Sequence, residues 1–407
     1  MKAHPQLAII LIAHLAIAAS VSGQDPAAAS SLAPEQFAIL PWGGTPADPA
    51  VLADIKACGF NLAGFVSPDG LDAVAAAGLK AIVSGLHVDD STAGLDEAEV
   101  ARRVKALTEK TASHPATYGY YLRDEPTAAL YPALAKWSAA VRAAAPKALP
   151  YINLFPIYAS AGGLGVPTYE EYLEQFVKTV KPAFISYDNY SLMDDGTLRD
   201  GYFQNLEAVR AAALRHDLPF WNIVLSNAHF HYAEPTDGGL NFQMYTTLAY
   251  GARGISYFTY FAPAIGNYRL APIDQFGNKT RTWDMLRRVN LQIHKLAPIY
   301  LTLKSVNVFH HPNVPSGCRG MDSSKFLSQL HGGDLMAGEF EGPEGAQFVL
   351  VVNKNLHRST PFGLQFKSSG PVGMVNSYSG HKQPWAGENI WLAPGQGMLL
   401  FVQPEKK

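Results

Sequence analysis

Eight short apolar segments alternate with longer amphipathic segments between residues 37 and 299, and this alternation constrains the fold of the chain more than any other feature. The apolar segments have the length of strands and end at Gly, Asn, Asp or Pro. The amphipathic segments carry their apolar residues at helical spacing. The sequence therefore predicts eight strands, each followed by a helix. The predicted strands are 37–43, 61–66, 81–86, 118–122, 151–155, 184–190, 220–226 and 254–260.

Eight strand-helix units over about 260 residues match the size and order of a (β/α)8 barrel, which we predict for residues 37–300. The alternative is an open doubly wound sheet, which usually carries a glycine-rich phosphate loop after its first strand. Here that position reads Pro-Trp-Gly-Gly-Thr-Pro from Pro41, without the G-x-G-x-x-G spacing. The barrel is therefore the better prediction.

The helical period disappears after residue 300. Apolar runs at 347–352, 373–375 and 397–402 alternate with turns rich in Gly, Pro, Asn and Ser. This pattern is typical of an antiparallel β-sandwich. A chain of 407 residues is also long enough for one large and one smaller domain. We predict a β-sandwich over residues 301–407.

The first residues have the order of a secretory signal: a lysine, an apolar run at 7–18 and then small residues up to Gly23. We expect a signal peptide at 1–23, an Ala/Ser-rich linker at 24–36 and a mature chain that starts near Gln24. The apolar run is shorter than the roughly 20 residues of a membrane-spanning helix. The sequence therefore predicts a secreted or periplasmic protein without a membrane span in the mature chain.

The net charge and the cysteines of the chain limit which partners, disulfides and metal sites we expect. The net charge is −2 and the basic residues are scattered, so we predict no nucleic-acid partner. Cys58 and Cys318 are the two cysteines. They could form one bridge, but a chain of this size does not depend on disulfides, and we expect both to be unpaired. No His/Cys cluster has zinc-ligand spacing, so we predict no metal site.

Two adjacent carboxylates follow the fourth predicted strand, in the order Arg123, Asp124, Glu125 and Pro126. In a (β/α)8 barrel the functional site lies at the carboxyl ends of the strands. Asp124 should raise the pKa of Glu125 and help it stay protonated, which is the state that a general acid needs. The alternative is that these acids only stabilise the first turn of a helix that Pro126 begins.

The sixth strand places Ser186, Asp188 and Tyr190 on one face, because side chains alternate along a strand. We expect this polar face to point into the barrel, with Asp188 reaching a ligand. The alternative is a structural Asp188 paired with Arg123. In the seventh strand the same reasoning points Asn222, Val224 and Ser226 inward.

Other strand ends add amides and aromatic rings. Asn153 lies on the fifth strand, His229 follows the seventh, Tyr260 ends the eighth, and Trp42 on the first is either a sugar platform or a plug of the barrel end. Carboxylates, amides and rings around one mouth suit a sugar, whose hydroxyls need polar partners and whose C–H faces lie on rings. Glycoside hydrolysis requires two carboxyl groups, and no cofactor is expected.

The segment from Tyr121 to Pro126 resembles the Asn-Glu-Pro or Asp-Glu-Pro signature of clan A glycoside hydrolases, in which the Glu after strand four is the acid/base. Segments 249–260 and 273–278 look like the last strand and loop of beta-galactosidase-like barrels. The resemblance covers residues 37–300. It implies a (β/α)8 barrel and a glycosidase in which Glu125 is the acid/base.

The seventh strand departs from that family. Clan A enzymes place a nucleophilic Glu at its end, whereas this chain has Ser226 and Asn227 there, and its nearest Glu is Glu234 in the following loop. The second carboxylate is then Asp188, Glu234, or a distant base in an inverting enzyme. We predict Asp188, because strand geometry aims it inward, and keep Glu234 as the alternative.

These observations predict a secreted glycoside hydrolase that cleaves a polysaccharide or oligosaccharide. Glu125 would protonate the leaving oxygen, and Asp188 would act as nucleophile or as base for water. The rival prediction is a carbohydrate-binding barrel without catalysis. The expected sugar-binding residues are Trp42, Asp124, Asn153, Tyr190, Asn222, His229 and Tyr260.

Overall fold

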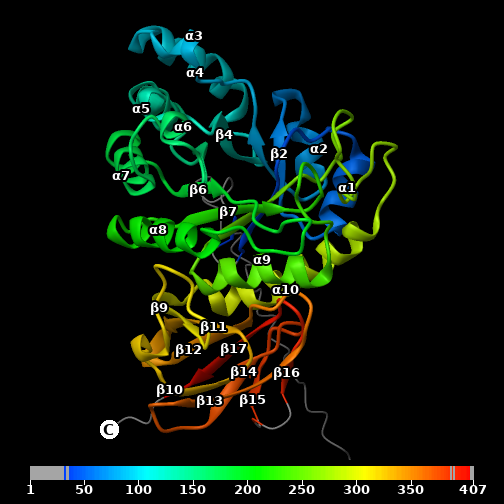
Figure 1. Cartoon of the computed structure of the whole chain (residues 1–407). Coiled ribbons are helices and arrows are strands. Elements are labelled where there is room, and N and C mark those ends of the chain that lie inside the picture. Colours follow the sequence, from blue (N-terminus) through cyan, green and yellow to red (C-terminus); the bar gives the residue numbers. More distant parts are fainter. Residues whose placement is uncertain (1–31, 34–35, 386, 388–389, 404–407) are drawn as a thin grey trace, which may run out of the picture.

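Eight parallel strands form a barrel in the first part of the chain, as the sequence predicts (Figure 1). The computed structural model describes residues 32–33, 36–385, 387 and 390–403. The expected signal peptide at 1–23 lies outside these residues, as does most of the expected linker. Each predicted strand overlaps an observed one. The barrel strands are β1 Ala38–Pro41, β2 Leu62–Val66, β3 Lys80–Val83, β4 Thr117–Asp124, β5 Leu149–Leu154, β6 Ile185–Asp188, β7 Phe220–Leu225 and β8 Gly254–Phe258.

Consecutive strands are neighbours around the barrel. The strands are hydrogen-bonded in the order β1-β8-β7-β6-β5-β4-β3-β2. The circle closes between β1 and β2, where the Phe65 amide donates to the Gly43 carbonyl at 2.9 Å. All carboxyl ends of the strands therefore meet at one mouth, which is where polar side chains can converge.

Helices cover the outside of the barrel. Side-chain caps mark where several of them begin: Asp48 caps α1, Thr168 caps α7 and Thr236 caps α9, each accepting bonds from first-turn amides. The helices are α1 Pro49–Ala57, α2 Leu71–Ala76, α3 Asp90–Ala93, α4 Glu97–Thr111, α5 Tyr131–Ala144, α6 Ala161–Leu164, α7 Tyr169–Val180, α8 Tyr202–Arg215, α9 Asp237–Ala249 and α10 Arg281–Tyr300.

Two apolar layers hold the barrel together. A large core fills the space between the strands and the helices. A smaller one fills the barrel interior, where side chains from several strands meet, among them Leu40, Trp42, Tyr151, Trp221 and Ile223. Strands that are buried on both faces give near-continuous apolar runs, which is why the eight segments stand out in the sequence.

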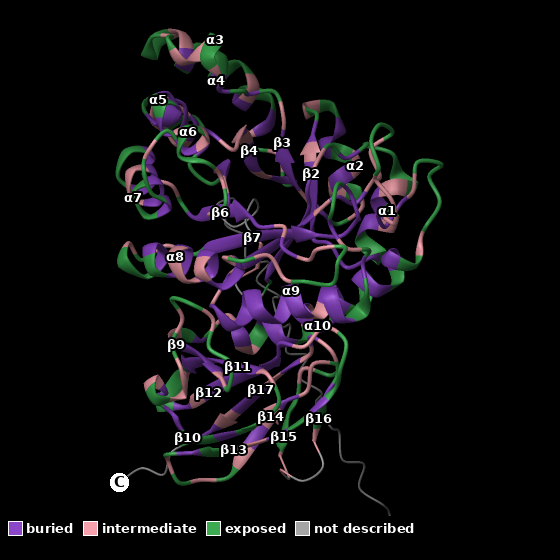
Figure 2. Cartoon of the chain, in the orientation of Figure 1, coloured by how far each residue is buried: buried purple, intermediate pink, exposed green. Residues whose placement is uncertain are grey.

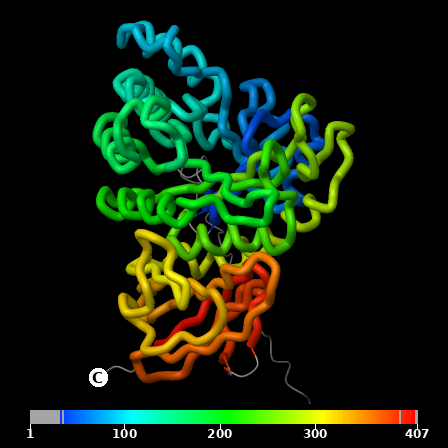
Figure 3. The backbone as a smooth tube through the Cα atoms, viewed as in Figure 1, coloured from blue at the N-terminus to red at the C-terminus, as the bar shows by residue number. Residues whose placement is uncertain are grey.

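The chain completes the barrel before it builds an antiparallel β-domain, which confirms the predicted architecture (Figure 3). One sheet has six strands in the order β15-β14-β17-β12-β11-β9, and the other has three in the order β10-β13-β16. A separate apolar core lies between them. The strands are β9 Lys304–His311, β10 Leu327–Gly332, β11 Leu335–Glu341, β12 Gln347–Asn353, β13 Thr360–Phe366, β14 Val372–Val375, β15 Lys382–Pro384, β16 Trp391–Leu392 and β17 Gly397–Val402.

Helix α9 joins the two domains. It contacts β11 and β12 on one side and the barrel strand β7 on the other, and nearly all of its residues are buried (Figure 2). Cys58 and Cys318 are both unpaired, as expected, and Cys58 is buried. Among the described residues, no helix is long and apolar enough to cross a membrane.

Candidate active site

Three carboxyl groups meet at the mouth of the barrel. Asp124 and Glu125 stand at the end of β4, Asp188 ends β6, and Asn153 lies on β5 between them. The Asn153 Nδ2 group donates to Asp124 Oδ1 at 3.0 Å and to Asp188 Oδ1 at 2.9 Å. Its Oδ1 accepts a bond from the Ser186 hydroxyl at 2.9 Å. The side chain of Asn153 therefore holds two carboxylates in place, which leaves it less free to bind a sugar hydroxyl than we predicted.

The backbone at Glu125 is held in an uncommon conformation. Its φ angle is 45°, in the left-handed region that costs a residue with a side chain about 1–3 kcal/mol. The Glu125 amide donates to the Asn153 carbonyl at 2.9 Å, and the Tyr172 hydroxyl donates to the Pro126 carbonyl at 2.7 Å. These two bonds fix the turn on both sides of Glu125. Strain of this kind is typical of functional sites.

The carboxyl groups of Glu125 and Asp188 are close enough that each affects the pKa of the other. Burial, and next the negative charge of Asp124, raises the pKa of Glu125 to about 7, although the interaction with Asp188 opposes the shift. Asp188 is almost fully buried, and its pKa is raised well above the ordinary range by burial and by the two neighbouring carboxylates. The pair therefore retains at least one proton near neutral pH.

Asp188 stands at the end of β6, and β5 with Asn153 separates it from Glu125 at the end of β4. The two carboxyl groups therefore belong to one polar cluster at the mouth of the barrel.

Tyrosines enclose the carboxyl cluster. Tyr190 is partly buried, and its pKa is raised by desolvation and by the nearby charges of Asp188, Asp124 and Glu125. Its amide donates to the Tyr158 hydroxyl at 3.2 Å, and the Arg199 guanidinium lies 4.4 Å from the centre of the Tyr158 ring. We did not predict Tyr158 or Arg199, because both lie in loops where no periodic pattern marks them.

His229 lies next to Tyr190, with their ring centres 6.1 Å apart. Its Nδ1 is 3.1 Å from Asn227 Oδ1, and its ring stacks on Tyr268 at 4.9 Å. Burial lowers the pKa of His229 to about 4, so the imidazole is neutral at pH 7. The structure therefore brings this predicted residue to the rim of the site as an uncharged hydrogen-bonding group.

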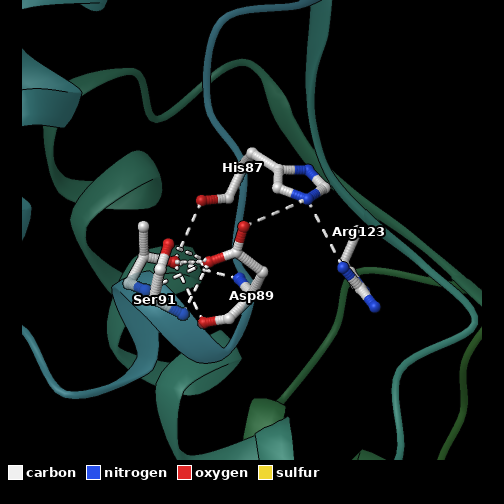
Figure 4. Close-up of polar contacts among 5 residues, drawn as sticks. His87, Asp89, Ser91 and Arg123 are labelled. Atoms are coloured by element: carbon white, nitrogen blue, oxygen red, sulfur yellow. Dashed lines mark hydrogen bonds and ion pairs between the residues drawn. The ribbon is translucent and has the colours of Figure 1, made fainter.

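Arg123 points toward His87 in a polar cluster that also holds Asp89 and Ser91 (Figure 4). Its Nη1 is 3.4 Å from His87 Nε2, and His87 in turn lies 3.6 Å from Asp89. Asp89 caps α3 by accepting bonds from the Ser91 amide and hydroxyl. The structural pairing of Asp188 with Arg123 is thus wrong, because Arg123 contacts His87, whereas Asp188 accepts a bond from Asn153.

The predicted orientation of β7 is wrong. Trp221 and Ile223 fill the barrel interior, and Asn222 points outward, where its Nδ2 donates to Thr247 Oγ1 on α9 at 2.9 Å. The cause is that α9 offers polar partners, while the barrel interior at this level is aromatic. There the ring centres of Trp221 and Phe184 are 4.6 Å apart. Asn222 therefore does not line the mouth.

Two aromatic candidates also lie elsewhere. Tyr260 is buried against α10, and its hydroxyl accepts a bond from Trp283 Nε1 at 3.0 Å. Trp42 packs inside the barrel, 4.8 Å from the Phe65 ring and 5.6 Å from the Tyr151 ring. Of the two predictions for Trp42, the plug of the barrel end is the one that the structure supports.

Glu234 does not join the carboxyl cluster. Its carboxylate is half exposed and forms ion pairs with Arg269 at 3.1 Å and Arg281 at 3.2 Å. The carboxylates that shift the pKa of Glu125 are Asp124 and Asp188. Asp188 is therefore the second carboxyl group that the fold brings to Glu125.

One group of described side chains has the composition of a metal site. Ligand atoms of Glu207, His310 and Cys318 lie within 4.8 Å of one another at the junction of the two domains. The Tyr250 hydroxyl sits among them, 3.1 Å from Glu207 Oε1 and 3.1 Å from His310 Nε2. These hydrogen bonds account for the cluster without an ion.

No protein-family model and no curated protein matches the chain. Several solved structures do match the fold of the chain. The fold resembles a protein described as "Glycoside hydrolase", with a TM-score of 0.56 and 12% identity over 91% of this chain and 93% of the other. It also resembles a glycoside hydrolase family 5 protein from Bacteroides vulgatus ATCC 8482, with a TM-score of 0.55 and 12% identity over 91% and 89% of the two chains.

A third match is the beta-galactosidase from the psychrophilic Marinomonas ef1, with a TM-score of 0.51 and 11% identity over 67% of this chain. The chain spans 63% of the length of that protein. At such low identity these matches establish the fold. The chain shares the fold of these glycoside hydrolases, and in this chain a (β/α)8 barrel is followed by an antiparallel β-domain.

Proposed function

We propose that the protein is a secreted glycoside hydrolase that cleaves a glycosidic bond in a polysaccharide or oligosaccharide. The observation that carries the proposal is the state of Glu125. It stands at the end of β4, at the mouth of a barrel shared with glycoside hydrolases, and its pKa is raised to about 7. A carboxyl group that keeps its proton near neutral pH is what protonation of a glycosidic oxygen requires. Export is supported by the signal-like order of residues 1–23.

In the proposed reaction, Glu125 gives its proton to the leaving oxygen as the bond from that oxygen to the anomeric carbon breaks. Water supplies the hydroxyl group that ends on this carbon. The proton that water loses returns to the carboxyl pair, with Asp188 as the second carboxylate, acting as base or nucleophile.

The surrounding groups fit a sugar. Asp124 has one oxygen engaged by Asn153, which leaves the other to accept a hydroxyl. The hydroxyls of Tyr158 and Tyr190 stay protonated at neutral pH, because burial raises the pKa of both. Together with neutral His229 they offer donors and acceptors next to aromatic ring surface.

Reducing-sugar release from a panel of plant, algal and microbial polysaccharides tests the proposal, with binding to each polysaccharide measured in parallel by affinity electrophoresis. We expect release from at least one substrate that the protein also binds. Binding without release from any substrate would identify a carbohydrate-binding barrel instead. Neither binding nor release would exclude carbohydrate as the ligand class.

Asp124→Asn should move the alkaline limb of the pH profile of kcat/KM to lower pH. The negative charge of Asp124 is the second cause of the raised Glu125 pKa, and Asn removes it while still accepting a bond from Asn153. Burial remains, so the pKa should fall but stay above its ordinary value. Asp72→Asn, at a fully exposed site, is the matched control. An unmoved limb in Asp124→Asn would contradict this electrostatic account.

A further inference from the structure

A pocket of about 430 Å³ lies where the barrel meets the C-terminal domain. Its walls come from α8, from the residues that precede β7 and β8, and from the start of β9. In Figure 1 α8 lies above β9, and Arg210 on α8 donates a hydrogen bond to Ser305 on β9. Since the carboxyl cluster stands at the opposite ends of the strands, this pocket is separate from the proposed active site. Its volume is within the range of about 300–1,000 Å³ that is usual for small-molecule sites.

Three cationic side chains line the pocket, against one carboxylate. The cations are Arg210 on α8, Arg253 before β8 and Lys304 at the start of β9, and the carboxylate is the exposed Asp217. Arg253 donates to the carbonyls of Tyr300, at 3.1 Å, and of Leu303. Carbonyl partners carry no net charge, so the positive charge of Arg253 is not neutralised by them. The pocket is therefore electropositive.

Arg210 is the most informative of the three. It is 4% exposed, its Nε donates to Ser305 Oγ at 3.2 Å, and its Nη2 is buried without a hydrogen-bond partner. The carboxylate that acts on Arg210 is Glu207, which also accepts a bond from Tyr250 and pairs with Arg319 at 3.7 Å. Burying a guanidinium charge is costly, and the charge of an anion in the adjoining pocket would offset part of that cost.

The rest of the wall is apolar. Leu214, Leu218 and Phe220 contribute to it, and Leu214 is about half exposed. We propose that this pocket binds a small organic anion, with its carboxylate, sulfate or phosphate group against Arg210, Arg253 and Lys304 and its apolar part against Leu214 and Leu218. The proposal does not depend on glycosidase activity.

Isothermal titration calorimetry of the full chain tests the ligand class. The probes are benzoate and phenyl phosphate, with benzyl alcohol as the neutral counterpart and inorganic sulfate as the anion without an apolar part. We expect saturable binding of at least one aromatic anion, at least tenfold tighter than benzyl alcohol and tighter than sulfate. Absence of saturable anion binding, or equal binding of benzyl alcohol, would overturn the proposal.

Variants locate the site. Lys304→Glu reverses a charge on an exposed side chain and should weaken anion binding at least tenfold, and Arg210→Gln should abolish it in protein that circular dichroism shows to be folded. Lys105→Glu, on the exposed face of α4, makes the same change in net charge and should bind like wild type. Wild-type affinity in both Lys304→Glu and Arg210→Gln, or an equal loss in Lys105→Glu, would contradict the assignment to this pocket.

Discussion

Glu125→Gln is expected to lower kcat on a natural substrate by about 10²–10⁴-fold, which is the usual contribution of general acid catalysis. Gln has nearly the same shape as Glu, but its amide cannot deliver a proton to the leaving oxygen. Steady-state kinetics at pH 6–7 measures the effect. KM should change far less than kcat, because the loss falls on the chemical step.

Glu170→Gln is the matched control for that variant. Glu170 is an exposed acid in the first turn of α7, and its loss should leave kcat within about twofold of wild type. Full activity in Glu125→Gln would remove Glu125 from the mechanism. A thermal unfolding curve close to that of wild type shows that an inactive variant is still folded.

Asp188→Asn is expected to lower kcat at pH 7 by about 10²-fold or more, because it removes the second carboxyl group. The Asn oxygen can still accept a bond from Asn153, so the side chain should keep its place. Steady-state kinetics at pH 7 measures the loss, and wild-type kcat in Asp188→Asn would contradict the assigned role.

The Asp188 variant also has an expected effect on stability. The pKa values of Asp188 and Glu125 are higher in the folded chain than in the unfolded one, so the folded state binds these protons more tightly. The stability that these two carboxyl groups contribute is present at low pH. It is lost as pH rises from about 4, the ordinary carboxyl pKa, toward the higher pKa values of the folded chain, about 7 for Glu125. Asp188→Asn should weaken this decline in melting temperature.

Glu234→Gln is the comparison that decides between the two candidate second carboxylates. Glu234 is paired with Arg269 and Arg281, so its replacement should leave the pH profile unchanged. If Glu234→Gln is inactive and Asp188→Asn is not, the assignment of the second carboxylate is reversed.

The strands and the first catalytic candidate could be predicted from the sequence for physical reasons. A barrel strand is buried on both faces, so its apolar run is conspicuous, and a polar residue at its end stands out. Asp124 and Glu125 follow such a run directly. On β6, the polar face of Ser186 and Asp188 does point inward, as the hydrogen bonds to Asn153 show.

The orientation of β7 could not be predicted in the same way. Alternation separates two faces of a strand but does not say which face is inside when both are buried. Asn222 finds a polar partner on α9, and Trp221 finds an aromatic interior, so the polar face points outward here. Tyr158 and Arg199 lie in loops, and how close Glu125 and Asp188 come depends on side-chain conformations across β5. Sequence periodicity carries none of this information.

The dependence of rate on the leaving group tests the central claim, that Glu125 protonates the departing oxygen, most directly. Wild type and Glu125→Gln are compared on a 2,4-dinitrophenyl glycoside and on an unactivated oligosaccharide of the same sugar. Because dinitrophenolate departs without a proton, we expect Glu125→Gln to lose about 10²–10⁴-fold on the oligosaccharide and less than about tenfold on the aryl glycoside. An equal loss on both substrates would contradict the acid role of Glu125.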